Sequence, residues 1–153
     1  MKNIFKLCFT FFLAGILASC EKNISTISYE DGKAPVLSAN RATISLSFAN
    51  KDEEAVKLSW TNPDYKFSTG PSSQDVVYLI EIDTAGANFT NPGRKAINLS
   101  KELTLSMTQG ELNDYMLNQM SLVPGMPHNL EIRVTSHLAN NSLPLASNIL
   151  KYT

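Results

Sequence analysis

The sequence predicts an all-β domain, an antiparallel β-sandwich with one short helix inserted between its strands. Apolar residues recur at every second position in several separate stretches, which is the period of half-buried strands. Turn signals rich in Pro, Gly, Asn and Asp separate these stretches. Six or seven short, half-polar strands are typical of a sandwich, whereas a parallel sheet covered on both faces needs strands that are apolar throughout.

The alternation is found along most of the chain and defines the expected core. It runs through Ile44, Leu46 and Phe48; Val56, Leu58 and Trp60; Tyr78, Ile80 and Ile82; Leu103, Leu105 and Met107; and Leu130, Ile132 and Val134. A last strand is expected near residues 148–152. Trp60 continues the inward series of its strand, so we expect it in the core, as in many sandwiches.

The segment TQGELNDYMLNQM, residues 108–120, breaks this pattern and predicts the helix. Thr108 and Glu111 have the spacing of a capping box, in which each side chain bonds the backbone N–H group of the other residue. Apolar residues at a spacing of four indicate that one helix face packs on the core. These residues are Leu112, Met116 and Met120.

The first residues, MKNIFKLCFTFFLAGILASC, have the organisation of an export signal. Lys2 and Lys6 precede an apolar run that ends at Leu17, which is the order found in signal peptides. This run is little more than half of the roughly 20 apolar residues that a transmembrane helix needs. We therefore expect the segment to direct export and then to be removed.

The end of this segment, Leu-Ala-Ser-Cys at residues 17–20, resembles the lipobox that bacterial lipoprotein signal peptidase recognises. The resemblance implies that residues 1–19 are a lipoprotein signal peptide and that Cys20 is lipidated. Two or three acyl chains hold a small domain firmly on a bilayer, because burial of each CH₂ group is worth about 0.8 kcal/mol. The alternative is a secreted protein in which Cys20 has no such role.

Beyond the signal, the sequence indicates one domain on a short tether. Residues 20–33 are polar and end in the turn signal Asp31-Gly32, so we expect a lipidated, flexible tether. Residues 34–153 are long enough to bury a core of their own. Because Cys8 lies in the segment to be removed, no disulfide is expected, and the core must hold the domain together.

The charge balance argues against a nucleic-acid partner. The chain has 13 basic and 14 acidic side chains, and removal of Lys2 and Lys6 leaves 11 basic against 14 acidic, a net charge of −3. The basic residues are scattered along the sequence, whereas a phosphate backbone requires them to be clustered.

The sequence contains no recognisable catalytic or metal-binding motif, so we predict no enzymatic activity, no cofactor and no metal site. His128 and His137 lie nine residues apart without a neighbouring cysteine, which does not fit a zinc site, and we expect both at the surface. Glu81 and Asp83 alternate with apolar residues, so we expect both to point outward on a solvated face. Glycoside hydrolysis needs two acids that face each other across a cleft. A lipid-anchored hydrolase would require such a pair, or a nucleophile beside a histidine.

Tyr65 and Phe67 are the candidate glycan-binding residues. Both lie in the segment 61–75, which is rich in Pro, Gly and Ser and predicts a long loop that is functional or simply mobile. Exposed aromatic rings stack on the apolar face of sugars. We expect these two rings to be better exposed than that of Trp60.

Four strings of the sequence together resemble one family, the SusE family. They are LSW at 58–60, YLIEID at 78–83, AGANF at 85–89 and SLPLASN at 142–148. The resemblance covers about residues 44–152 and is to the N-terminal domain of those lipoproteins. It implies an immunoglobulin-like (fibronectin type III-like) sandwich for residues 34–153.

The resemblance also implies a function, that of an outer-membrane lipoprotein in a glycan-uptake system. Such a protein works beside a TonB-dependent transporter and a SusD-like lipoprotein, and it binds starch-type or other oligo- or polysaccharides. Family members usually continue into further β-sandwich modules that carry the sugar-binding aromatic residues, whereas this sequence ends at Thr153, so no family binding residue is carried over. The alternative is a structural spacer or protein–protein interaction module without glycan binding of its own. The side of the membrane that the domain faces stays open.

Overall fold

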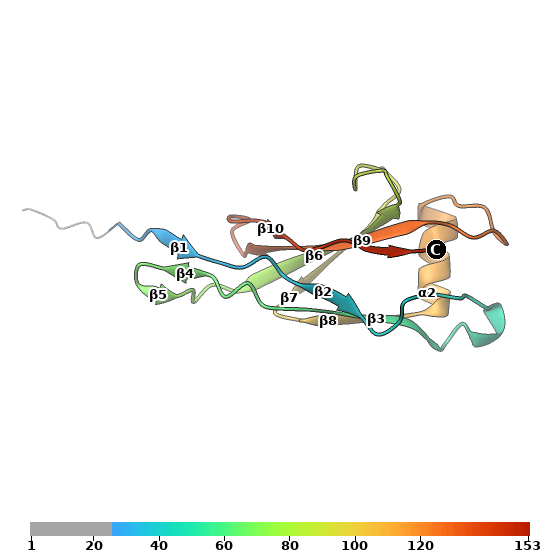
Figure 1. The fold of residues 1–153 in the computed structure, drawn as a ribbon, viewed down its shortest axis with the longest axis horizontal. Coiled ribbons are helices and arrows are strands. Elements are labelled where there is room, and N and C mark those ends of the chain that lie inside the picture. Colours follow the sequence, from blue (N-terminus) through green and yellow to red (C-terminus); the bar gives the residue numbers. More distant parts are fainter. Residues whose placement is uncertain (1–25) are drawn as a thin grey trace, which may run out of the picture.

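The computed structural model of the chain describes residues 26–153. The predicted signal peptide, Cys20 and the first part of the predicted tether lie outside the described residues. The described part forms an elongated, mostly β structure, with β1 near one end and Thr153 towards the other (Figure 1). No helix among these residues is long and apolar enough to cross a membrane.

The strands form three antiparallel sheets. The largest contains β10 (Leu145–Ala146), β9 (Leu130–Leu138), β6 (Val76–Thr84) and β7 (Lys95–Ser100) in this order, and β11 (Leu150–Tyr152) also pairs with β9. The second contains β2 (Leu37–Ala39), β3 (Glu54–Trp60) and β8 (Thr104–Thr108). The smallest contains β1 (Tyr29–Asp31), β4 (Lys66–Phe67) and β5 (Gly70–Pro71).

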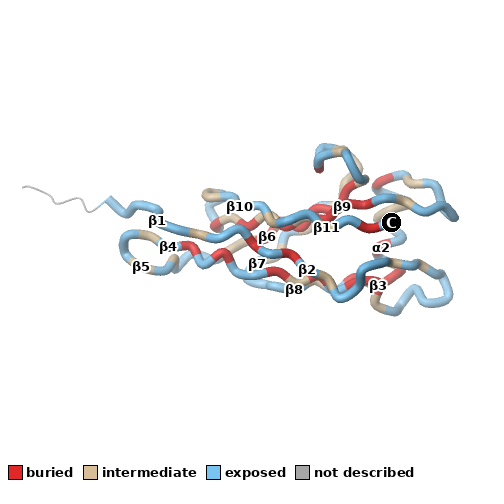
Figure 2. Tube along the Cα trace, in the orientation of Figure 1, coloured by how far each residue is buried: buried red, intermediate tan, exposed pale blue. Residues whose placement is uncertain are grey.

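The two larger sheets pack face to face around one apolar core, which runs along the middle of the molecule (Figure 2). Trp60 from β3 meets Tyr78 from β6, with 5.7 Å between the ring centroids. Trp60 is buried, which confirms its predicted place in the core, although its indole N–H finds no hydrogen-bond partner. Such an unpaired group costs about 1–3 kcal/mol, which burial of the large ring offsets.

Most of the predicted strands are confirmed, but the prediction of a strand at residues 44–48 is wrong, because these residues do not form one. β2 occupies the place beside β3 instead, and Leu37 pairs with Trp60. The Asn40 side chain then accepts the N–H of Lys57 at 2.8 Å, which ends the pairing. Phe48 lies in the short 3-10 helix η2 (Phe48–Asn50) and is 87% exposed.

The predicted helix is present as α2 (Gln109–Asp114) followed by the π-helical turn η3 (Tyr115–Gln119). The capping box of Thr108 and Glu111 is confirmed, since each side chain bonds the backbone N–H of the other. Leu112 is buried against the core, as the apolar spacing predicts. The helix therefore closes the end of the core between the two sheets.

The outer face of β6 differs from the sequence-based expectation, because Glu81 and Asp83 are buried rather than solvated. The segment 85–94 folds back over this face and brings Phe89 and Arg94 with it (Figure 1). Glu81 accepts Nε–H of Arg94 at 3.0 Å and Nε–H of Arg133 at 2.7 Å. The Arg133 guanidinium stacks on the Phe89 ring, 4.1 Å from its centroid.

Asp83 and Glu131 are buried beside this ion cluster. Backbone N–H groups hold Asp83, whereas Lys151 and the N–H of Gly86, at 3.4 Å, hold Glu131. Asp83 accepts the N–H groups of Thr84 at 2.7 Å and Asn91 at 3.3 Å. Glu131 forms a salt bridge with Lys151 at 3.1 Å, and this bond is the main cause that lowers its pKa. These carboxylates are structural groups that fasten the segment 85–94 to the sheet.

The Glu81→Gln substitution is expected to lower the free energy of unfolding by about 1–3 kcal/mol. It leaves two guanidinium groups without their carboxylate, and loss of one partner of a fully buried pair costs roughly 3–5 kcal/mol. The smaller loss is expected here because Arg94 and Arg133 remain partly exposed. Urea unfolding followed by circular dichroism measures the change. The same substitution at the exposed Glu102 should stay within about 0.5 kcal/mol, and equal effects of the two variants would contradict the argument.

Candidate binding site

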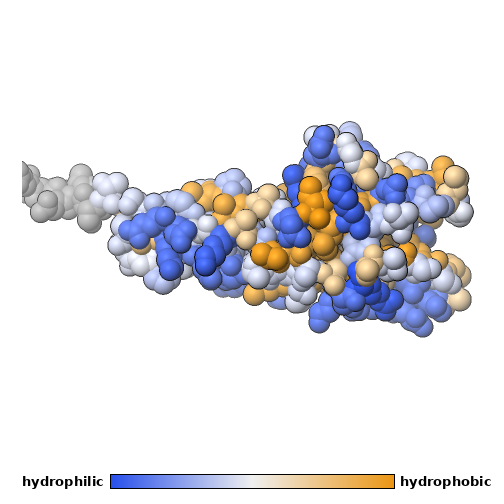
Figure 3. Space-filling view, in the orientation of Figure 1, coloured by the Kyte–Doolittle hydropathy of each residue, from blue (hydrophilic) through white to orange (hydrophobic). Residues whose placement is uncertain are grey.

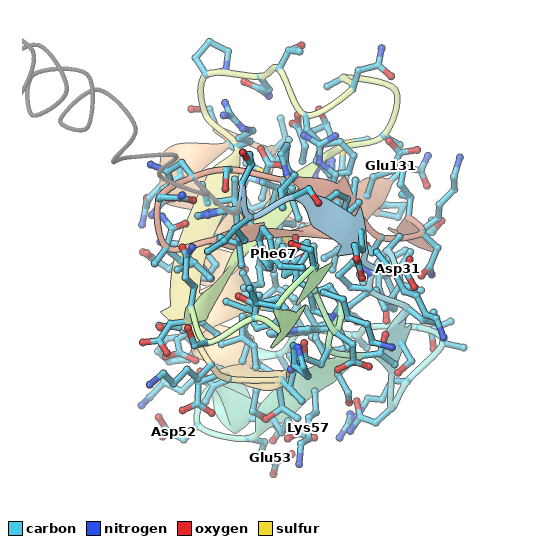
Figure 4. All side chains as sticks on the ribbon, turned by 90° about the vertical axis from the view of Figure 1, so that its left-hand side faces the viewer. Asp31, Asp52, Glu53, Lys57, Phe67 and Glu131 are labelled. Atoms are coloured by element: carbon cyan, nitrogen blue, oxygen red, sulfur yellow. The ribbon has the colours of Figure 1, made fainter. Side chains whose placement is uncertain are left out.

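A cavity of about 480 Å³ opens where the smallest sheet meets the beginning of β6. Residues from β1, from the segment 61–75 and from β6 line it, and Lys101 closes one side. Figure 4 looks onto this end of the molecule, where Asp31 and Phe67 are labelled. The cavity volume lies within the range of roughly 300–1,000 Å³ that is usual for small-molecule sites.

Local hydrogen bonds shape the segment 61–75, which the sequence predicts as a loop. Asn62 accepts the N–H of Asp64 through its side chain at 3.0 Å, and Asp64 has a φ of 50°. Such a side-chain bond to the backbone two residues further on is typical of Asn at a turn. The segment then forms β4 and β5, which pair with each other, and β4 also pairs with β1. Part of the predicted loop, and the end of the predicted tether, are therefore strands.

Tyr65 forms a rigid wall of this cavity and is not exposed, so the expectation of an exposed ring is wrong. It is 3% exposed, and its hydroxyl donates to the carbonyl of Leu143 at 2.6 Å. The same hydroxyl lies 3.1 Å from Oγ of Ser136. Burial raises the pKa of Tyr65, so the group stays neutral and keeps these bonds. A ring held in this way offers no free face to a sugar.

Phe67 keeps part of its surface in solvent. It is half-buried on β4, and Tyr29 of β1 meets it edge to face, with 6.0 Å between the ring centroids. Phe67 does not line the cavity, so the two candidates predicted from the sequence do not form one site.

Polar side chains of both signs surround the cavity mouth. Asp75 and Lys101, which both line the cavity, form a salt bridge of 3.0 Å. Asp64 and Gln74 add a carboxylate and an amide. The mixture of donors and acceptors over buried tyrosine rings suits a neutral ligand rich in hydroxyl groups. Sequence reasoning missed these residues, although Asn62-Pro63-Asp64 is a turn signal that places polar side chains together.

The two histidines lie outside this cavity. His128 Nε2 lies 2.7 Å from the carbonyl oxygen of Val123, and His137 Nδ1 lies 2.9 Å from that of Leu138. Both are partly exposed. Within residues 26–153, no three His, Cys, Asp or Glu side chains are placed to hold a metal ion.

The described residues therefore form a two-layered β domain with a polar cavity between the segment 61–75 and β6. The model of the SusE outer membrane protein family matches residues 22–135, which is well over half of the chain. The chain therefore belongs to the SusE family, and the resemblance found in its sequence is confirmed. The match includes all the residues that line the cavity. No curated protein matches the chain.

The Tyr78→Phe substitution is expected to reduce the loss of stability in alkaline solution. Tyr78 borders the cavity, and burial raises its pKa to about 12, whereas an unfolded tyrosine titrates near about 10. Between these values the unfolded chain has lost the proton and the folded chain keeps it, so stability falls as the pH rises. The side chain accounts for a loss of up to about 3 kcal/mol.

Urea unfolding at about pH 8 and about pH 11 tests this. Part of the slope should remain in the variant, because burial also raises the pKa of Tyr65 and Tyr152. Tyr29→Phe, at an exposed position, is the control and should leave the slope as it is in the unmodified chain. An unchanged slope in Tyr78→Phe would show that the argument is wrong.

Proposed function

We propose that this chain is a non-catalytic, lipid-anchored component of a SusE-like glycan-binding and uptake system at the outer membrane. The match to the SusE outer membrane protein family carries the proposal. The order of the strands, β2-β3-β8 facing β10-β9-β6-β7, supports an immunoglobulin-like (fibronectin type III-like) sandwich. The anchor is lipid on Cys20, and the partners are a TonB-dependent transporter and a SusD-like lipoprotein.

Glycan contact is proposed at the polar cavity. Sugar hydroxyls need donors and acceptors in fixed positions, and Asp64, Gln74 and the ion pair of Asp75 with Lys101 supply them. Tyr65 contributes as a fixed wall, whereas Phe67 offers a ring edge on the neighbouring surface.

The second candidate function is a structural spacer or interaction module without glycan binding of its own. Three of the large rings that could stack on sugars, those of Trp60, Tyr65 and Tyr78, are buried. The elongated shape, with β1 near one end, suits a domain that holds other parts of a complex at a distance from the tether (Figure 1).

Intact mass of the protein from its native host tests the proposed anchor. We expect the mature chain to begin at Cys20 and to carry the mass of a diacylglycerol group with or without a further acyl chain. Cys20→Ala should abolish both the processing and the added mass, because no thiol remains to accept the lipid. The matched control is Cys8→Ala, which should leave both unchanged. A mature chain with a free thiol at Cys20 would refute the anchor.

Calorimetric titration with maltooligosaccharides separates the two candidate functions. If the cavity binds the glycan, Gln74→Ala should weaken binding about two- to tenfold, because one hydrogen bond is worth roughly 0.5–1.5 kcal/mol. Gln119→Ala, exposed on the helix, is the matched control. Absence of heat up to millimolar ligand would remove starch-type binding by this domain. If no heat is observed but a TonB-dependent transporter is recovered with the chain, the result supports the spacer function.

A further inference from the structure

A second cavity, of about 330 Å³, lies at the end of the molecule opposite the polar one. Its walls are the segment 44–46, the helices α2 and η3, and the segment 123–128. Leu130 from β9 and Tyr152 from β11 also line it. We call this cavity the distal groove. Figure 1 shows these elements gathered around the C-terminal residue, far from β1.

The lining of the distal groove is mostly apolar, with Ser45, Asn113, His128 and Thr153 as its polar members, and contains no Asp, Glu, Lys or Arg. Val123 is 59% exposed and Met126 is 64% exposed at its mouth. Leu46 connects the groove to a smaller hollow beside the exposed Phe48. Hydrophobic side chains accordingly reach the surface at this end (Figure 3). Exposed apolar side chains gathered around a groove are typical of interaction sites in proteins.

The walls of the groove are held in place by backbone bonds. Leu122 N–H donates to the carbonyl of Met116 at 2.9 Å, and Met120 N–H donates to that of Tyr115 at 3.0 Å. The His128 ring bonds the Val123 carbonyl and closes the opposite wall. A groove with fixed walls binds a partner at a smaller entropic cost than one that must first be ordered.

Carboxylates border this apolar surface. Glu111 and Asp114 are exposed on α2, next to the lining residue Asn113. Asp52 and Glu53 are exposed close to Phe48, and both are labelled in Figure 4. The nearby Lys51 is already bonded to Asp52 at 2.8 Å. The border beside α2 and η2 therefore keeps negative character through Glu53, Glu111 and Asp114, whereas Arg41 and Lys151 lie beside Tyr152 on another side.

We propose that the distal groove docks a polypeptide segment of another protein, one that presents large apolar side chains with Lys or Arg beside them. The apolar part of the lining accommodates the large apolar side chains, and the carboxylates at the border attract the Lys or Arg. A second copy of this chain fits poorly, because two acidic borders would meet. This interaction goes beyond the proposed glycan contact and uses a different end of the molecule.

Photo-crosslinking in the native host tests the proposal with the full chain. A photoreactive amino acid replaces Met126, and in a separate strain it replaces the exposed Ser73 at the polar end. We expect an adduct that is several-fold stronger from position 126. Mass spectrometry of the adduct should identify a segment of a different protein in which apolar residues adjoin Lys or Arg.

Two charge variants sharpen the test, and thermal unfolding confirms that each is folded. Val123→Asp places a charge at the mouth of the groove and should reduce the adduct about tenfold. Val36→Asp is the matched control, because Val36 is 61% exposed outside the groove, and it should leave the adduct unchanged. Equal loss in both variants would overturn the proposal. So would an adduct to a second copy, to lipid alone or to an acidic segment, or the absence of an adduct.

Discussion

The pairing of β6 with β9 is the constraint on which the rest of the structure depends. The two strands pair over their full length, from Val76 with Leu138 to Thr84 with Leu130. A shift by one residue would turn every side chain of a strand to the opposite face, so this register decides what each residue meets. It directs Ile80 towards the core and places Glu81 beside Arg133 on the other face.

Both faces of β6 are therefore buried, and only one of them was predictable. Alternation along a strand states which residues share a face, but it does not state what covers that face. Solvent would cover the face of Glu81 if the next segment ran away from the sheet. Instead, Asn88 and Phe89 adopt positive φ values of 53° and 57° and turn the chain back. Gly86, Asn88 and Gly93 indicate a turn, but no local pattern indicates that the segment covers the face of the carboxylates.

The elements that the sequence predicts correctly depend on neighbouring residues, whereas those that it predicts wrongly depend on distant parts of the chain. The capping box and the strand that contains Trp60 depend on residues within a few positions of each other, and the sequence was sufficient for both. Residues 44–48 have the same alternation as a strand, yet β2 occupies the only place beside β3 on that side. The hairpin of β4 and β5 required β1, more than thirty residues earlier, as its partner. Competition between segments for a place in a sheet, and pairing with a distant strand, decide such cases, whereas local β-propensity does not.

The polar cavity and the distal groove belong to opposite ends of this one strand pair. Tyr78, near the beginning of β6, borders the cavity, whereas Leu130, which pairs with the last residue of β6, lines the groove. Ile80, Ile82 and the carboxylates Glu81 and Asp83 lie between them and are buried, so the two hollows are separated by packed residues. The proposed glycan contact and the proposed docking groove would therefore use separate surfaces of the domain and would not compete for the same residues.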